Sequence, residues 1–226
     1  MPQICRPRKI KFVAGLVAIL AGVSFGSRHF SYAAPDQPQI RASEISLKLS
    51  TVRDPIVFIG DSITEGAPLP KEICGRPTID AGISGLDAAT YFFALRKIGN
   101  FRAAAIVVAL GTNDARKDHD SDFAADYLKL VQALEPSSSK LILAGIPPLE
   151  DVPVVFELFD KARAERINKY IAAIAKQRGH RFVDLETALM SERRVTKDGV
   201  HLSSSGYALW VDAFRANVAA ALGCTN

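Results

Sequence analysis

The chain has 226 residues, of which 48% are hydrophobic and 23% are charged. This length and composition suit one globular domain with a buried core, and they exclude a wholly disordered protein. The net charge of +4 comes from residues 1–33, which carry five basic residues and no acidic residue. The rest of the chain has 23 of the 28 basic residues and all 24 acidic ones. A nucleic-acid-binding surface is therefore not indicated.

Residues 1–33 have the layout of a secretory signal peptide. A basic stretch ends at Lys11, an apolar run covers residues 12–25, and small residues precede Ala34. The run has 14 residues, whereas a bilayer span needs about 20. We expect cleavage after Ala33 and an exported protein, periplasmic or secreted, with no stable membrane anchor. An uncleaved anchor is the alternative.

The segment 34–54 is polar and contains Pro35 and Pro38, which indicates a linker followed by a short helix. Beyond it, residues 55–226 alternate apolar runs with helical patterns. Unbroken apolar runs are typical of parallel strands that are covered on both faces. The runs lie at 56–59, 78–81, 104–110, 141–144 and 182–185.

Amphipathic patterns between these runs predict helices at 87–97, 121–135, 158–178 and 203–222. Asp87 is the expected N-cap of the first, and Gly179 and Gly223 are the expected ends of the last two. Such alternation predicts a three-layer α/β/α domain with right-handed crossovers. In this class of fold the functional site lies at the carboxyl ends of the strands.

Four short motifs follow strands or precede a helix. Gly60-Asp61-Ser62 comes directly after the first strand, and Asp80-Ala81-Gly82-Ile83-Ser84-Gly85 spans the end of the second. Gly111-Thr112-Asn113-Asp114 follows the third strand, and Asp198-Gly199-Val200-His201 precedes the last helix. A catalytic histidine needs a carboxylate on one ring nitrogen, and a tight turn allows Asp198 to supply it.

In their order and spacing these motifs resemble the blocks of the GDSL/SGNH hydrolase family, over roughly residues 56–220. The resemblance implies a flavodoxin-like sandwich with a five-stranded parallel sheet in the order 2-1-3-4-5. It also implies a carboxylic ester hydrolase that forms an acyl-enzyme and needs no cofactor or metal.

By the same resemblance, Ser62 is the nucleophile and His201 its base, oriented by Asp198. The oxyanion hole would consist of the N–H groups of Ser62 and Gly85 and the side-chain amide of Asn113. One departure is Asp80, which stands where an Asn is common. The connection between Ser62 and the second strand is also short, which suggests an open site and a preference for short acyl groups such as acetyl.

Several readings remain open for the substrate. A small-molecule or polysaccharide ester fits, but a thioesterase or an O-acyltransferase would use the same residues. A non-catalytic carbohydrate- or envelope-binding module is an alternative from another class. Residues 154–159 are either core or a hydrophobic wall for an acyl or aryl group. His119 is expected to face solvent, with the rim of the cleft as the alternative.

Cys74 and Cys224 remain after removal of the signal. The last helix runs back from His201 toward the amino ends of the strands, and Cys74 precedes the second strand. Both cysteines are then expected at the same end of the sheet. This placement predicts a disulfide, which an oxidising compartment would preserve. Two buried free thiols are the alternative.

Overall fold

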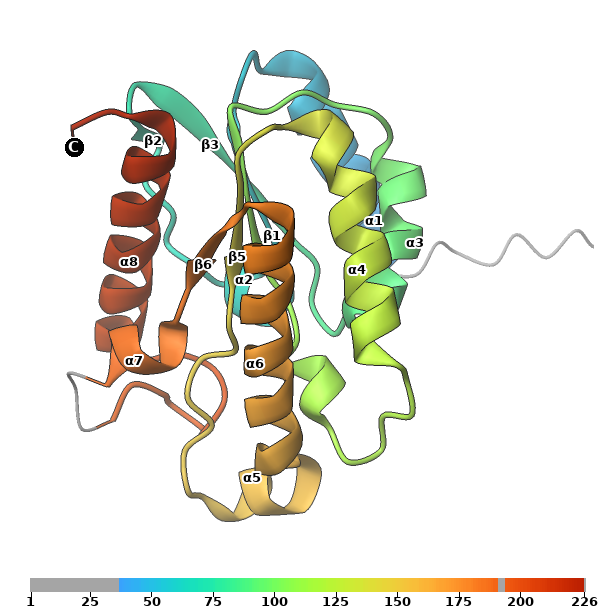
Figure 1. Cartoon of the computed structure of the whole chain (residues 1–226), viewed down its shortest axis with the longest axis vertical. Helices are drawn as coiled ribbons and strands as arrows, with labels where there is room; N and C mark the ends of the chain where they lie inside the picture. Colours follow the sequence, from blue (N-terminus) through green and yellow to red (C-terminus); the bar gives the residue numbers. More distant parts are fainter. Residues whose placement is uncertain (1–36, 191–193, 226) are drawn as a thin grey trace, which may run out of the picture. The chain divides into compact units, whose positions relative to one another are not determined.

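The computed structural model describes residues 37–190 and 194–225, so the expected signal segment lies outside the described residues. Within them a six-stranded sheet has the order β2-β3-β1-β4-β5-β6 (Figure 1). The strands are β1 Ile56–Gly60, β2 Glu72–Ile73, β3 Arg76–Gly82, β4 Ala105–Ala109, β5 Leu141–Ala144 and β6 Arg181–Val183.

Five of these strands, from β3 through β1, β4 and β5 to β6, are parallel and confirm the expected order 2-1-3-4-5. The sixth, β2, corrects the expected strand count. It pairs antiparallel with β3, with Glu72 opposite Pro77 and Ile73 opposite Arg76. Two residues are too few to show a strand periodicity in the sequence.

The described helices are α1 Gln37–Thr51, α2 Ser62–Glu65, α3 Ala88–Ile98, α4 Phe123–Leu134, α5 Pro153–Leu158, α6 Lys161–Arg178, α7 Leu185–Leu189 and α8 Ser204–Leu222. Short 3-10 helices, η1 and η2, cover Asn113–Ala115 and Glu135–Ser137. Within the described ranges, no helix has both the length and the apolar character needed to cross a bilayer.

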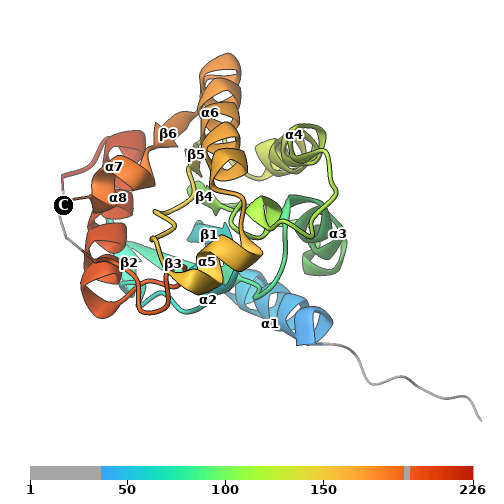
Figure 2. The same cartoon turned by 90° about the horizontal axis from the view of Figure 1, so that it is seen from below.

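The sheet separates two apolar cores, which makes the fold the expected three-layer α/β/α sandwich. In β1, Val57 and Ile59 pack into the core covered by α1, α3, α4 and α6. Ile56 and Phe58 point the other way, into the core covered by α7 and α8. Figure 2 shows these helix groups on opposite sides of the strands. All residues of β1 are buried, which explains its unbroken apolar sequence.

The helix expected over 158–178 begins three residues later, as α6 at Lys161, and a separate short helix, α5, precedes it. α5 ends at Leu158, and Phe159 has an extended backbone. The side chain of Asp160 then accepts a hydrogen bond from the N–H of Arg163 and caps α6. A helix N-cap is worth about 1 kcal/mol, and here it starts a new helix inside a stretch whose apolar pattern continues across the break.

Cys74 and Cys224 form a disulfide, with Cα atoms 6.1 Å apart. Cys74 lies in the turn between β2 and β3, and Cys224 follows the end of α8. Figure 1 shows this end of the sheet at the top and α5 at the bottom. The disulfide expected from the placement of the two cysteines is therefore confirmed.

Candidate active site

Ser62 begins α2 immediately beyond the end of β1. Asp61 caps this helix, because its Oδ1 accepts the N–H of Ile63 at 2.9 Å. Gly60 is required for the sharp return of the chain. A Cβ there would lie 1.9 Å from Thr64 Oγ1 and 2.8 Å from the carbonyl oxygen of Ala109. The half-buried hydroxyl of Ser62 is thereby held at the carboxyl edge of the sheet.

His201 reaches this hydroxyl from the loop before α8. Its Nε2 lies 3.0 Å from Ser62 Oγ, and its Nδ1 lies 2.8 Å from Asp198 Oδ2. An ionised carboxylate can only accept, so Nδ1 must carry the proton that faces Asp198. In the neutral imidazole Nε2 is then free to accept the hydroxyl proton of Ser62. The arrangement is that of a nucleophile, its base and an orienting acid.

Asp198 is fixed by its own loop. Its Oδ1 accepts the backbone N–H groups of Val200 at 3.0 Å and of His201 at 2.7 Å. Partial burial acts to raise the pKa of Asp198, but these N–H groups and the His201 ring outweigh it and hold the pKa below its usual value. Asp198 therefore stays ionised and can stabilise an imidazolium at His201.

Asn113 and Gly85 lie at the ends of the neighbouring strands. The Asn113 amide donates to the carbonyl oxygen of Leu86 at 2.9 Å, its one side-chain hydrogen bond among the described residues. A second amide hydrogen is left for a ligand. Gly85 has φ +79°, and no atom lies within 4 Å of where its Cβ would be. The residues expected to form an oxyanion hole thus follow β1, β3 and β4 at one edge of the sheet.

Two buried carboxylic acids lie behind these loops. Burial raises the pKa of Asp61 to about 6, although the N–H of Ile63 opposes the shift. Burial also raises the pKa of Asp114 to about 7, and the nearby charge of Asp87 adds to the effect. Asp114 accepts the N–H of Ala88 at 3.2 Å and so ties the start of α3 to the loop that carries Asn113.

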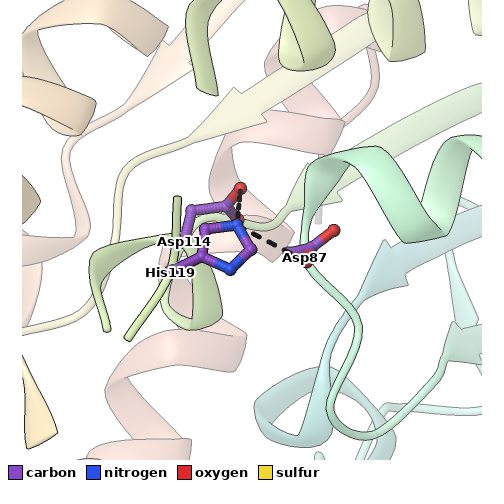
Figure 3. Close-up of side chains that lie close together, drawn as sticks. All are labelled: Asp87, Asp114 and His119. Atoms are coloured by element: carbon purple, nitrogen blue, oxygen red, sulfur yellow. Dashed lines mark ion pairs between the residues drawn. The ribbon is translucent and has the colours of Figure 1, made fainter. Parts of the chain in front are cut away.

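His119 does not face solvent as expected, because its side chain is only 20% exposed. Its Nε2 lies 3.5 Å from Asp87 Oδ2 and 3.8 Å from Asp114 Oδ1 (Figure 3). The ligand atoms of the three side chains lie within 4.8 Å of one another, the one such group of three or more among the described residues. These three side chains could hold a divalent cation. A positive charge on His119 would be an alternative partner for the negative charges of Asp87 and Asp114.

Glu150 is a positioning residue that the motifs did not reveal. Its Oε1 accepts the backbone N–H groups of Val195 at 2.7 Å and Thr196 at 3.1 Å, and its own N–H donates to Gly199 O at 3.0 Å. The loop after β5 therefore holds the loop that carries His201. These contacts join residues more than 40 positions apart, so no local pattern in the sequence indicates them.

The segment 154–159, expected as core or wall, contributes to both. Val155 is fully buried, whereas Val154, Phe156 and Leu158 are exposed by 42%, 54% and 40%. A Cβ on Gly199 would lie 2.3 Å from the side chain of Val152, so α5 starts beside the loop that carries His201. The exposed apolar side chains of α5 therefore belong to this side of the molecule.

The fold and this constellation are those of an α/β/α-sandwich hydrolase with a serine at a strand end. The model of the GDSL-like Lipase/Acylhydrolase family matches residues 58–209. The chain therefore belongs to this family and is an ester hydrolase. No curated protein matches the sequence.

Solved structures with the same fold share little sequence with the chain. A GDSL-like lipase from Bacteroides thetaiotaomicron is 21% identical with a TM-score of 0.64, over 81% of this chain and 100% of that one. A lipase/acylhydrolase from Enterococcus faecalis is 19% identical with a TM-score of 0.62, over 74% and 95%. An acetylxylan esterase from Geobacillus stearothermophilus is 18% identical with a TM-score of 0.59, over 74% and 94%.

Proposed function

We propose that the protein hydrolyses short-acyl esters through a covalent acyl-enzyme on Ser62. The observation that carries the proposal is the continuous contact from Ser62 Oγ through the His201 ring to Asp198, at 3.0 and 2.8 Å. Ser62 is positioned by the turn after β1, and Asp198 and His201 are positioned together by the turn before α8, so the geometry does not depend on a bound ligand.

In the first half-reaction Ser62 Oγ attacks the carbonyl carbon while its proton passes to His201 Nε2. The carbonyl oxygen becomes an oxyanion, which the N–H groups of Ser62 and Gly85 and the Asn113 amide would stabilise. The alcohol leaves with the proton from His201, and the acyl group stays on Ser62. Water then gives a proton to His201 and attacks the acyl carbon, which releases the acid and restores the Ser62 hydroxyl.

Short acyl groups, acetyl above all, are the expected substrates, and acetylated carbohydrate is the favoured class. The connection from α2 to β2 runs only from residue 66 to 71 and leaves little material for a lid. The structural likeness to an acetylxylan esterase adds support from the fold. A panel of esters of increasing acyl length, run beside acetylated xylan, tests this. Rates that climb steadily with acyl length would contradict it.

Labelling by a fluorophosphonate tests the proposed nucleophile. The wild-type protein and Ser43→Ala, a change at an exposed serine on α1, should both be labelled and active. Ser62→Ala should lose both properties. Asp198→Asn should keep the fold but lose about 10⁴-fold in kcat, because His201 would adopt the wrong tautomer. An unlabelled wild-type protein would instead favour a non-catalytic binding module.

Export is part of the proposal. Residues 1–33 have the layout of a cleaved signal, and the Cys74–Cys224 disulfide suits an oxidising compartment. Mass spectrometry of the processed protein should give an N-terminus at Ala34. A full-length product held in the membrane would identify residues 1–33 as an anchor.

A further inference from the structure

The oxyanion loop, residues 83–86, is bound to α2 by one carboxylate. Glu65, the last residue of α2, accepts the N–H of Ser84 at 2.7 Å and its hydroxyl at 2.6 Å, both on Oε2. Ser62 opens this helix and Gly85 follows Ser84. Glu65 therefore links the segments that carry two of the three proposed oxyanion donors.

Arg41 holds the other side of this junction. Its Nε donates to the carbonyl oxygen of Gly82 at 3.0 Å, and its Nη2 donates to Asp80 Oδ2 at 2.7 Å. The same Nε lies 3.8 Å from Glu65 Oε1. Gly82 is the last residue of β3, so the guanidinium contacts the strand immediately before the oxyanion loop.

Arg41 lies on α1, and its contact with the end of β3 therefore comes from a helix outside the segment that carries the site motifs. α1 precedes the residues that match the family model, and it packs against β3 and α3 (Figure 2). The Arg41 side chain is only 16% exposed. An arginine held by several acceptors at fixed geometry orients them more strictly than a flexible surface charge would.

Three carboxylates lie around the Arg41 guanidinium and would lose its positive charge if Arg41 were replaced. Asp80 and Glu65 both face it, and Glu44 lies 3.6 Å from its Nη1. Burial raises the pKa of Asp80, and the N–H of Gly82 and the charge of Arg41 act against that rise. Without the cation, the carboxylates of Asp80 and Glu65 would remain beside the loop with no positive partner among the described residues.

We propose that Arg41 is a positioning residue for the reaction, which holds the oxyanion loop against α2 through Gly82, Asp80 and Glu65. The inference rests on the proposed function, because it assigns a role to the loop that carries Gly85. Loss of Arg41 should weaken oxyanion stabilisation in the transition state while substrate binding is largely kept. Displacement of a reacting group by about 1 Å can cost as much as 10²-fold in rate.

The test compares Arg41→Ala and Arg41→Lys with Lys48→Ala, a control that removes an exposed charge from the same helix. Arg41→Ala should lower kcat by about tenfold or more, with KM within about threefold of the wild-type value. Arg41→Lys keeps the positive charge but not the planar set of guanidinium N–H donors, so its kcat should lie between those of Arg41→Ala and the wild type. Lys48→Ala should match the wild type.

The double variant Arg41→Ala/Asp80→Asn distinguishes a positioning role of Arg41 from a general loss of folded structure. It removes one of the two carboxylates that Arg41→Ala leaves without a partner, so its kcat should exceed that of Arg41→Ala, and the two changes should be non-additive. Circular dichroism and fluorophosphonate titration would normalise each kcat to folded, labelled protein. If Arg41→Ala does not fold, Arg41→Lys and Glu65→Gln should still show a severalfold loss confined to kcat.

A folded Arg41→Ala with wild-type kcat, or one altered in KM alone, would overturn the inference and leave the proposed function intact. So would wild-type kcat in both Arg41→Lys and Glu65→Gln. A wild-type protein that is neither labelled nor active on esters would overturn the proposed function, and this inference with it. The first measurement on the wild-type protein therefore separates the two failures.

Discussion

Gly199 and Val152 are packed so closely that a Cβ at residue 199 would lie 2.3 Å from Val152 Cγ2. Gly199 also has φ +95°, a backbone conformation that side chains disfavour. It stands between Asp198 and His201, so this contact determines how the turn that carries both residues sits against α5.

Gly199→Ala should therefore lower kcat by at least about tenfold, because the turn must move and carries His201 with it. Gly179→Ala is a matched control. Gly179 has φ +70°, but no atom lies within 4 Å of its added Cβ, and it ends α6 far along the chain from the site motifs. The control should lose stability without losing kcat. Equal kcat in both variants would show that the turn tolerates the displacement.

The buried Asp114 should make stability depend on pH. Its pKa is raised from 3.8 to about 7 in the folded protein. The folded state therefore holds the proton more tightly, and the protein loses stability from this group as the pH rises from about 4 to 7. Asp114→Asn cannot ionise, so its stability relative to the wild type should increase over that range, by about 2–4 kcal/mol.

Urea unfolding at pH 5 and pH 8 would measure that difference. Asp61 titrates in the same window, and its charge contributes to the raised pKa of Asp114, so the measured difference includes the interaction between these two carboxylic acids. The exposed Asp212 provides a control, and Asp212→Asn should show no such trend. A difference between Asp114→Asn and the wild type that stays constant with pH would mean that the pKa of Asp114 is not raised in the folded protein.

The Cys74–Cys224 disulfide spans 150 positions in the chain. A loop of that length restricts the unfolded chain strongly, so Cys74→Ser/Cys224→Ser should lower the free energy of unfolding by about 2–5 kcal/mol. The bond lies at the end of the sheet opposite Ser62, and kcat should therefore be unchanged. Unfolding of the wild type with and without reductant gives a second measure, and equal unfolding midpoints would contradict the prediction.

Much of the fold was predictable from local patterns. Asp87 caps α3 through a capping box, Gly179 ends α6 in the left-handed conformation, and Ser203 caps α8. Each signal acts within one helical turn. The division between α5 and α6 was not predictable in the same way, because the apolar pattern continues through Phe159 while the backbone is extended there.

The residues of the candidate site also differ in whether a local sequence pattern indicates them. Ser62, Asn113 and His201 could be identified because each stands in a short motif at a strand end or before a helix. Arg41 and Glu150 could not, since their side chains form hydrogen bonds to residues 39 to 46 positions away. Only the sheet order and the packing of α1 and the loop after β5 bring these groups to the site.

Asn113 offers the sharpest remaining test of the mechanism. One amide hydrogen is bound to Leu86 O at 2.9 Å, which aims the second away from that carbonyl. If the second hydrogen stabilises an oxyanion, it acts mainly in the transition state. Asn113→Ala should then lower kcat by about 10²–10³-fold, or roughly 3–4 kcal/mol, with little change in KM.

Asn217→Ala is the control for the loss of a similar hydrogen bond, because the Asn217 amide also donates to a backbone carbonyl at 2.9 Å, that of Ala213 in α8. It should leave both kinetic constants at their wild-type values. A rise in KM alone for Asn113→Ala would make Asn113 a substrate-binding residue. Unchanged kinetics would mean that Asn113 is not an oxyanion donor and that the N–H groups of Ser62 and Gly85 suffice. Removal of a true donor lowers the rate even when the other donors stay in place.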